Sequence, residues 1–367
     1  MTLRLIPKWF ILWFLKVFGS RSKVFAAQNI FYMDALKAAK SIHKRTGILK
    51  KNLIKDMLHC YLKYGASIED YQAYNFYRLN DFGRREFLCT NSYMSMRDLI
   101  NPKGVEWDIL SSKNKTNKLF HEFLGRSYIY CGEVSEEQIM AFTKEQGKFI
   151  VKPDGEYAGA GIYVTSFDEL EDPLGFCREV RKKKMIIEEL VEQHSDTAQV
   201  NPESLNTIRI NTVIDANGIA QIFTAAFRMG VGNVKIDTLH RGGIAAPVDL
   251  KTGKLCSPAY GVDAMPHREH PHTGVFLLGL QLPFWEDAKW MVLKAAARIP
   301  QIRLIGWDVA ITAQGPILIE GNQHPGLFPL QMLDQTGIRQ KFLMFLTKNL
   351  NEKNHDMHLT NLLSRVD

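Results

Sequence analysis

The stretch of residues 303–327, RLIGWDVAITAQGPILIEGNQHPGL, places the strongest constraint on how this chain can fold. Residues 304–312 are an apolar run rich in β-branched side chains, and a second apolar run follows at 317–319. The Ala-Gln-Gly-Pro sequence at 313–316 breaks the pattern between them, as a turn does. The stretch therefore predicts a β-hairpin with largely buried strands.

Three side chains that carry oxygen atoms interrupt these apolar strands. Asp308 stands in the first strand, Glu320 ends the second, and Asn322 points the same way as Glu320 because strand side chains repeat every two residues. Mg²⁺ takes its ligands from a few such oxygens and from phosphates, so the trio is typical of a magnesium–nucleotide site. The alternative is that the two acids only end strands at a solvated edge. Burial argues against it, because a buried carboxylate needs a partner or a metal.

The composition limits the class of protein. With 367 residues, of which 46% are hydrophobic and 23% charged, the chain is globular and long enough for two or three subdomains. Its net charge of +7 suits an anionic substrate, an acidic membrane surface or nucleic acid. No zinc-finger spacing and no aromatic–basic RNA motif accompanies that charge, so we expect no nucleic-acid partner.

Two features bear on where the protein works. Five scattered cysteines without a CxxC pair indicate reduced thiols and a cytoplasmic protein. The apolar and basic N-terminal segment, residues 1–20, has an uncharged run at 9–15 that is shorter than the roughly 20 residues a bilayer core requires. Two interpretations stay open, a helix docked on the main body and an amphipathic helix in a membrane interface. The flanking positive charges favour the second, a peripheral contact on the cytoplasmic face.

Residues 21–105 are expected to form a helical N-terminal domain, because apolar residues recur three and four positions apart and β-branched runs are few. The polar tail at 349–367 is expected to be peripheral. The helical segment contains no recognisable catalytic constellation.

A glycine-rich loop follows an apolar strand at residues 148–152. The strand ends in Lys152, and Gly155, Gly159 and Gly161 come next. Glycines let backbone N–H groups approach phosphate oxygens, and a lysine adds a positive charge. The loop is not a Walker A motif, because no GK[ST] follows, and a plain turn is the alternative.

The segment 185–192, MIIEELVE, reads as a buried strand that emerges into acids. Such a strand end can hold a purine ring while backbone groups read the adenine edge and a carboxylate takes the ribose hydroxyls. That interpretation would use Glu188, Glu189, Leu190 and Val191. The alternative is a strand followed by a solvated turn.

Two arginines, Arg209 and Arg228, stand inside otherwise apolar strands of a predicted antiparallel pair. An arginine in that position pairs with a buried acid or faces an anion-binding cleft.

Taken in order, these pieces resemble the ATP-grasp superfamily, and most closely its sugar-transfer-associated branch. The most specific match is EGNQHPG at residues 320–326, which fits the family pattern E-x-N-x-x-P-G, with Asp308 as the acid on the preceding strand. Lys152-Pro153 and the glycine-rich loop add to the match, which covers roughly residues 64–333. The resemblance implies an α+β fold, the ATP-grasp fold, in which two α+β lobes clamp ATP between antiparallel sheets after a helical N-terminal region.

The resemblance also assigns domains and roles. Lobe A with the lid would span residues 106–190, and lobe B with the metal site would span 191–348. Two magnesium ions would be held by Asp308, Glu320 and Asn322, and the transferring phosphate would be neutralised by Arg209 and Arg228.

The resemblance gives the remaining ATP contacts to lobe A. Lys152 would contact ATP, residues 155–161 would form the flexible lid, and residues 188–191 would be the adenine hinge. Lys118 would be a second lysine on ATP, but Lys113 and Lys115 stand close by and could take its place, and a solvated surface lysine is the simplest alternative.

The activity that the resemblance implies is ATP-dependent carboxylate–amine ligation. A small-molecule carboxylate would attack the γ-phosphate to give ADP and an acyl phosphate, and an amine would then displace phosphate to leave an amide. By analogy with the branch, an amino acid or amine would be joined to a sugar acid in surface polysaccharide biosynthesis.

Two other functions stay open. One is a phosphotransferase on the same fold, for which His240 or His324 could be the catalytic histidine. The other is a non-catalytic nucleotide-binding module, which retained binding without turnover would favour.

Overall fold

The computed structural model describes residues 21–101, 107–155, 160–215, 217–232, 242–261, 265–326, 331 and 335–350. The chain divides into two compact units, with the boundary between Tyr93 and Met94. Gly159, His240 and residues 1–20, which the sequence singled out, lie outside the described residues.

The first unit is helical, which confirms the predicted helical N-terminal region. Its elements are α2 (Arg21–Thr46), α3 (Lys50–Tyr64), α4 (Ile68–Ala73), the short 3-10 helix η1 (Phe76–Arg78) and α5 (Asp81–Arg85). Helix α6 (Thr90–Ile100) crosses the boundary between the units.

Local sequence signals explain where helices of the first unit end and begin. Gly65 closes α3 in the left-handed conformation that a glycine adopts without strain, with φ of 65°. Ser67 then opens α4 with a capping box, in which Ser67 and Asp70 each accept a hydrogen bond from the other's backbone N–H. The aromatic run that follows α3 is core, since Tyr71, Tyr74 and Phe76 are each at most 1% exposed.

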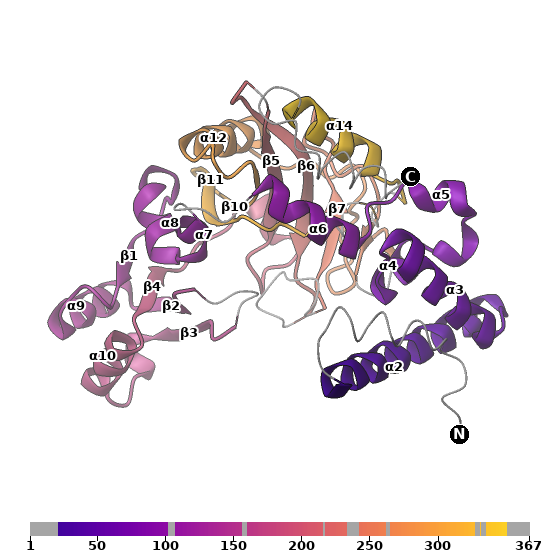
Figure 1. Ribbon diagram of the computed structural model, residues 1–367. Coiled ribbons are helices and arrows are strands. Elements are labelled where there is room, and N and C mark those ends of the chain that lie inside the picture. The colour runs from indigo at the N-terminus through magenta and orange to yellow at the C-terminus, as the bar shows by residue number, and fades with distance from the viewer. Residues whose placement is uncertain are drawn as a thin grey trace. The chain divides into compact units, whose positions relative to one another are not determined.

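The second unit contains a small antiparallel sheet with strand order β1-β4-β2-β3. Its strands are β1 (Tyr128–Tyr130), β2 (Lys148–Pro153), β3 (Tyr163–Ser166) and β4 (Met185–Glu189). Helices α9 (Glu136–Gln146) and α10 (Pro173–Lys182) lie beside this sheet (Figure 1) and share its hydrophobic core, which includes Phe149 and Ile187.

A larger sheet of seven strands has the order β11-β10-β5-β6-β7-β8-β9, and all its neighbours are antiparallel. The strands are β5 (Thr207–Ile214), β6 (Ala220–Met229), β7 (Ile244–Pro247), β8 (Ala259–Tyr260), β9 (Pro266–His267), β10 (Leu304–Thr312) and β11 (Gly315–Asn322). The predicted hairpin is thus β10–β11, and two mainly antiparallel sheets with helices give the expected α+β class.

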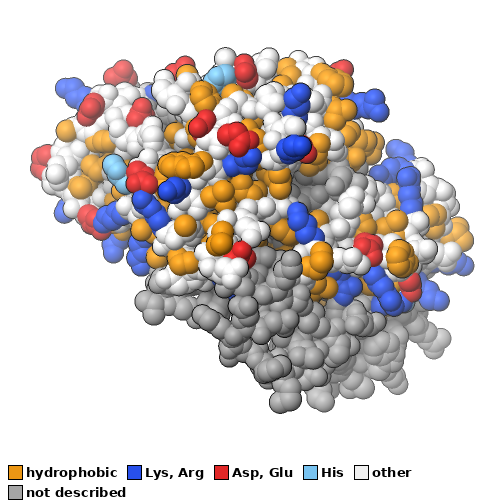
Figure 2. Space-filling model, turned by 90° about the horizontal axis from the view of Figure 1, so that it is seen from above, with side chains coloured by type: hydrophobic (Ala, Val, Ile, Leu, Met, Phe, Trp, Pro, Cys, Tyr) orange, Lys and Arg blue, Asp and Glu red, His pale blue; other side chains and the backbone are white. Residues whose placement is uncertain are grey.

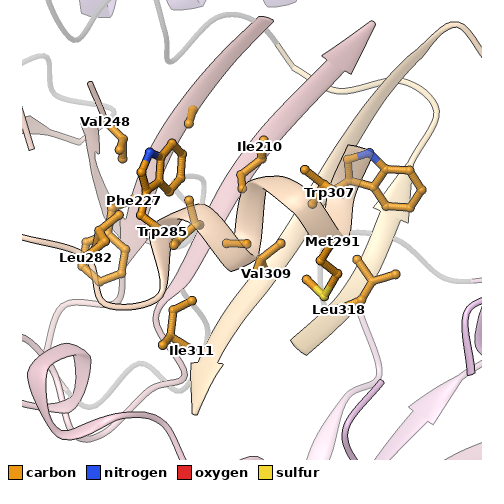
Figure 3. Packing of buried hydrophobic residues seen from close by; sticks show 14 of the residues in the cluster. Ile210, Phe227, Val248, Leu282, Trp285, Met291, Trp307, Val309, Ile311 and Leu318 are labelled. Carbon is orange, nitrogen blue, oxygen red and sulfur yellow. The ribbon is translucent and has the colours of Figure 1, made fainter. Parts of the chain in front are cut away.

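Helix α12 (Trp285–Arg298) covers one face of the large sheet (Figure 1). Figure 3 shows Ile210, Val309 and Met291 packed between the strands and the helix. Trp307 belongs to the same core, and its indole N–H donates a hydrogen bond to Thr212 Oγ1 at 2.8 Å. Because strand side chains alternate, the residues between these apolar ones face the other side of the sheet.

Shorter elements complete the described part of the second unit. These are α7 (Trp107–Ser111), α8 (Lys113–Leu119), η2 (His121–Phe123), η3 (Phe167–Glu169), α11 (Ser195–Ala198) and α14 (Arg339–Leu350). Among the helices that the structure describes, none is long and apolar enough to cross a bilayer.

Candidate active site

The polar face of the large sheet carries a row of charged side chains across neighbouring strands. Asp308 on β10 lies opposite Glu320 on β11 and opposite Arg209 on β5. The next row, two residues along each strand, pairs Gly306 with Asn322 and with Asn211. The antiparallel register therefore brings four side chains together on one face. They are the three predicted metal ligands, Asp308, Glu320 and Asn322, and the predicted phosphate contact Arg209.

Two arginines hold the carboxylate of Asp308, which is 2% exposed. Arg209 donates from Nε at 2.5 Å and from Nη2 at 3.0 Å, and Arg228 donates from Nη2 at 3.1 Å. Burial alone would raise the pKa of Asp308, but the two guanidinium charges outweigh it and lower that pKa to about 2. Of the two arrangements expected for these arginines, pairing with a buried acid is the one present.

The neighbouring Glu320 has the opposite shift. Burial, and then the negative charge of Asp308 beside it, raise the pKa of Glu320 above its usual value. Two acidic side chains in contact repel each other when both are ionised, and a divalent cation between them removes that repulsion. With the amide oxygen of Asn322 on the next register position, the donors are all oxygen, which fits Mg²⁺.

The end of β11 is fastened by an asparagine that nothing in the sequence singles out. The side chain of Asn101 donates to the backbone carbonyls of Leu304 and Gln323, both at 2.7 Å, and accepts from the N–H groups of Arg303 and Leu304. Asn101 is 2% exposed, so these bonds are sheltered from water. Asn101, which is far from both segments in sequence, thereby holds the segment after Asn322 against the start of β10.

A second buried charge cluster lies in the small sheet, around Glu188 of β4. Its carboxylate accepts from Arg126 Nε at 2.8 Å, from Lys152 Nζ at 2.6 Å and from Asn117 Nδ2 at 3.1 Å. Arg126 also donates to the backbone carbonyl of Leu318 at 2.7 Å, so it joins β4 to β11. The sequence prediction brought Lys152 and Glu188 into the site but missed Arg126 and Asn117, which stand in no recognisable motif.

The remaining residues of the predicted hinge lie at the end of β4. Glu189 accepts from the backbone N–H of Ser127 at 2.9 Å. Leu190 and Val191 follow the strand and are half-buried. Their contact with adenine stays a prediction.

The glycine-rich loop is anchored at its first end by Asp154. The Asp154 carboxylate accepts from Ser112 Oγ at 3.0 Å and from the backbone N–H of Asn114 at 3.3 Å, both at the start of α8. Gly155 and Gly161 have φ of 85° and 69°, a conformation that side chains disfavour. Two of the three glycines are thus used for backbone shape, and the approach of this loop to phosphate stays a prediction.

The family is decided by comparison with known proteins. Residues 101–346, more than half of the chain, match the model of the family described as "Sugar-transfer associated ATP-grasp". The chain belongs to this family. The ATP-grasp fold and the family predicted from the EGNQHPG motif are therefore confirmed. A search of curated proteins finds no match.

Solved ATP-grasp structures are similar to this chain at low identity. The ligase PsnB with a minimal precursor has a TM-score of 0.42 and 13% identity, and the match covers 66% of this chain and 62% of PsnB. A RiPP-associated ATP-grasp ligase from Chryseobacterium gregarium has a TM-score of 0.44 and 12% identity, and the match covers 72% of this chain and 69% of that ligase. D-alanyl-alanine synthetase A from Vibrio cholerae has a TM-score of 0.39 and 14% identity, and the match covers 70% of this chain and 65% of the synthetase.

Burial separates the three lysines of α8 in this ATP-grasp chain, because Lys113 is half-buried whereas Lys115 and Lys118 are exposed. Lys118 points to the surface, where it donates to Glu133 at 2.6 Å and is 54% exposed. Burial lowers the pKa of Lys113, and the charges of Glu320 and Glu188 act on it in the opposite direction. Lys113 therefore lies within electrostatic reach of both acidic clusters, and the contact of any of the three lysines with ATP stays a prediction.

Glu188 should make acid destabilise the protein. Burial would raise the pKa of Glu188, but Arg126 and Lys152 hold it below the value of about 4.3 in an unfolded chain. Between the two values the unfolded state binds more protons, so stability rises with pH there. The stabilisation is complete at neutral pH and is lost as the pH falls below about 5. In urea unfolding, we expect Glu188→Gln to differ most from the wild type at pH 7 and least at pH 3.5. An equal difference at both values would contradict this assignment.

Gly306 is expected to tolerate no side chain. A Cβ there would lie 2.7 Å from Pro325 Cβ, 2.9 Å from Asn211 Oδ1 and 3.1 Å from Arg209 Cδ. Gly306→Ala should lower the free energy of unfolding by about 1–3 kcal/mol and ATP turnover by about 10²-fold, because it displaces Arg209. Gly83→Ala is the control, since its Cβ would make only ordinary contacts of 3.5 Å or more. Equal activity of the two variants would show that this close approach is unimportant.

Proposed function

We propose that this ATP-grasp chain is a carboxylate–amine ligase that forms an amide and releases ADP and phosphate. The observation that carries the proposal is the buried Asp308 carboxylate, held by Arg209 and Arg228 beside Glu320. Asp308, Glu320 and Asn322 would hold two magnesium ions, which supply positive charge to the phosphates of ATP. The opposite lobe would contribute Lys152, Lys113 and the glycine-rich loop.

The chain's own residues would act by position and charge. Arg209 and Arg228 are oriented by Asp308 and would neutralise the phosphoryl group while a substrate carboxylate oxygen attacks the γ-phosphorus and ADP leaves. The amine then attacks the carbonyl carbon of the acyl phosphate, and phosphate departs with the former carboxylate oxygen. The loop anchored by Asp154 would close over the site and exclude water, which would otherwise hydrolyse the acyl phosphate.

The substrate class rests on the family description alone. An association with sugar transfer supports a sugar-linked carboxylate or amine, such as an amino acid joined to a sugar acid of a surface polysaccharide. Both substrates would be small molecules. Cytoplasmic ATP places the reaction in the cytoplasm, with residues 1–20 as a candidate peripheral contact with the membrane.

A phosphotransferase is the second candidate, because a histidine lies beside the proposed metal ligands. The backbone N–H of His324 donates to Asn322 Oδ1 at 2.8 Å. In a phosphotransferase, His324 would either accept the phosphoryl group or remove the proton from the acceptor hydroxyl. In both cases His324→Ala would abolish turnover. In a ligase that needs no side-chain nucleophile, we expect a smaller loss.

Phosphorus NMR separates the two reactions. Purified protein and Mg-ATP are incubated with a matrix of amino acids and amines against uronic acids and nucleotide-sugar acids. The proposal expects ADP and free phosphate only where an acid and an amine are both present. Phosphate retained on a single acceptor would make the protein a kinase, and the ligase proposal would fail.

A further inference from the structure

The first unit carries a concentration of positive charge that the ATP site does not use. Between Asp34 and Asp56 there is no acidic residue, and seven of the residues in that interval are Lys or Arg. They flank the turn that joins α2 to α3 (Figure 1): Lys44 and Arg45 lie in the last turn of α2, and Lys50 and Lys51 begin α3. All four are exposed.

Most of the positive charge of this turn is not neutralised by the acidic residues that the structure describes. Lys44, Lys50 and Lys51 have no ion-pair partner among the residues that the structure describes. On the face that Figure 2 shows, cationic, acidic and hydrophobic side chains are interspersed. The turn between α2 and α3 therefore presents a net positive charge to solvent.

The same turn exposes an apolar side chain to solvent. Leu49 is 54% exposed and lies between the two pairs of cations. The loop is ordered by its own hydrogen bonds: Gly47 N–H donates to His43 O at 2.8 Å, and His43 Nδ1 lies 2.9 Å from Ile48 O. Leu49 is thus exposed by a defined backbone conformation.

We propose that this turn, Lys44, Arg45, Leu49, Lys50 and Lys51, docks the protein on an anionic membrane surface. Lysines beside an anionic leaflet gain electrostatic attraction, and a single apolar side chain at the centre of the cations enters the headgroup region. This contact is separate from the ATP chemistry and from residues 1–20.

Charge type and shape favour lipid over nucleic acid. Six of the seven cations between Asp34 and Asp56 are lysines, which act as point charges, and no Phe, Tyr or Trp stands among them to stack on a base. An exposed leucine would have no role on a phosphate backbone, whereas a bilayer interface accepts it.

Vesicle flotation with the full chain tests the proposal. The wild type should float with phosphatidylcholine vesicles that contain phosphatidylserine and should bind pure phosphatidylcholine vesicles more weakly. Lys44→Gln/Lys50→Gln/Lys51→Gln should reduce the partition coefficient by about tenfold or more, because each charge contributes to attraction within a Debye length. Leu49→Ser should reduce it about fivefold, as expected when the exposed half of one leucine side chain becomes buried.

The matched control removes three exposed lysines of the second unit, Lys182→Gln/Lys251→Gln/Lys254→Gln. It loses the same charge and should float as the wild type does. To remove any contribution of the N-terminal segment, both triple variants are repeated with Trp9→Ser and Trp13→Ser. Circular dichroism verifies folding, and ATP turnover should be unchanged in all of them.

Two results would overturn the proposal. The first is equal flotation of the turn variant and its control in both backgrounds. The second is loss of binding to a fluorescent single-stranded RNA with unchanged flotation, which would assign the turn to nucleic acid. Neither result bears on the ligase proposal, because that proposal is tested by measuring the products formed from ATP.

Discussion

Glu320→Gln is expected to lower ATP turnover by about 100-fold or more and to leave the protein at least as stable as the wild type. The loss follows because an amide replaces a charged ligand in a site that must bind magnesium and phosphate. Stability is retained because burial and Asp308 already raise the pKa of Glu320, so its charge is unfavourable in the folded protein without metal. The measurements are ADP release and urea unfolding at pH 7.

Two comparisons make this prediction specific. Glu286→Gln, at a side chain that is 75% exposed, should leave turnover and stability as they are. Asp308→Asn should lose turnover and also stability, because the half-buried Arg209 and Arg228 would be left without their counter-charge. Near-normal turnover in Glu320→Gln would remove the metal assignment, and a large loss of stability would contradict the electrostatics described for the pair.

Arg126→Met is expected to lower the free energy of unfolding by about 3–5 kcal/mol. The substitution leaves Glu188 buried with one cation fewer, and both side chains of this pair are only 2% exposed. It also removes the donor to Leu318 O, so β4 and β11 lose a direct connection. Methionine retains much of the volume, which separates the effect of charge from that of packing. Urea unfolding measures the loss.

The control for Arg126 is Arg178→Met. Arg178 pairs with Glu136 at 3.4 Å and is 64% exposed, so solvent screens the interaction and we expect a change of under about 1 kcal/mol. Similar destabilisation in the two variants would mean that the buried cluster around Glu188 contributes little. Because Lys152 shares that cluster, Arg126→Met should also raise the KM for ATP.

The sequence was informative where side-chain period and motif agree. The hairpin of residues 304–319 follows from apolar runs separated by a turn, and the two-residue period correctly placed Glu320 and Asn322 on one side. The EGNQHPG motif then led to the family. Arg209 was expected to pair with a buried acid or to face an anion-binding cleft, and the strand register supplies Asp308 as the acid.

Other parts depend on contacts between distant segments, which local patterns do not encode. Asn101 meets Leu304 and Gln323 across about 200 residues, so its role is visible only in the folded chain. The choice among the lysines near α8 had the same difficulty. Spacing could not distinguish Lys113 from Lys118, whereas burial and nearby acids do.

Transfer of an oxygen isotope from the substrate carboxylate to phosphate tests whether the reaction passes through an acyl phosphate. The carboxylate that supports ATP turnover in the substrate matrix is labelled with ¹⁸O and incubated with the protein, Mg-ATP and the matching amine. The account predicts one ¹⁸O atom in each phosphate released, because the carboxylate oxygen that attacks the γ-phosphorus leaves with phosphate when the amine displaces it. Unlabelled phosphate alongside ADP would contradict the acyl-phosphate route and the ligase function built on it.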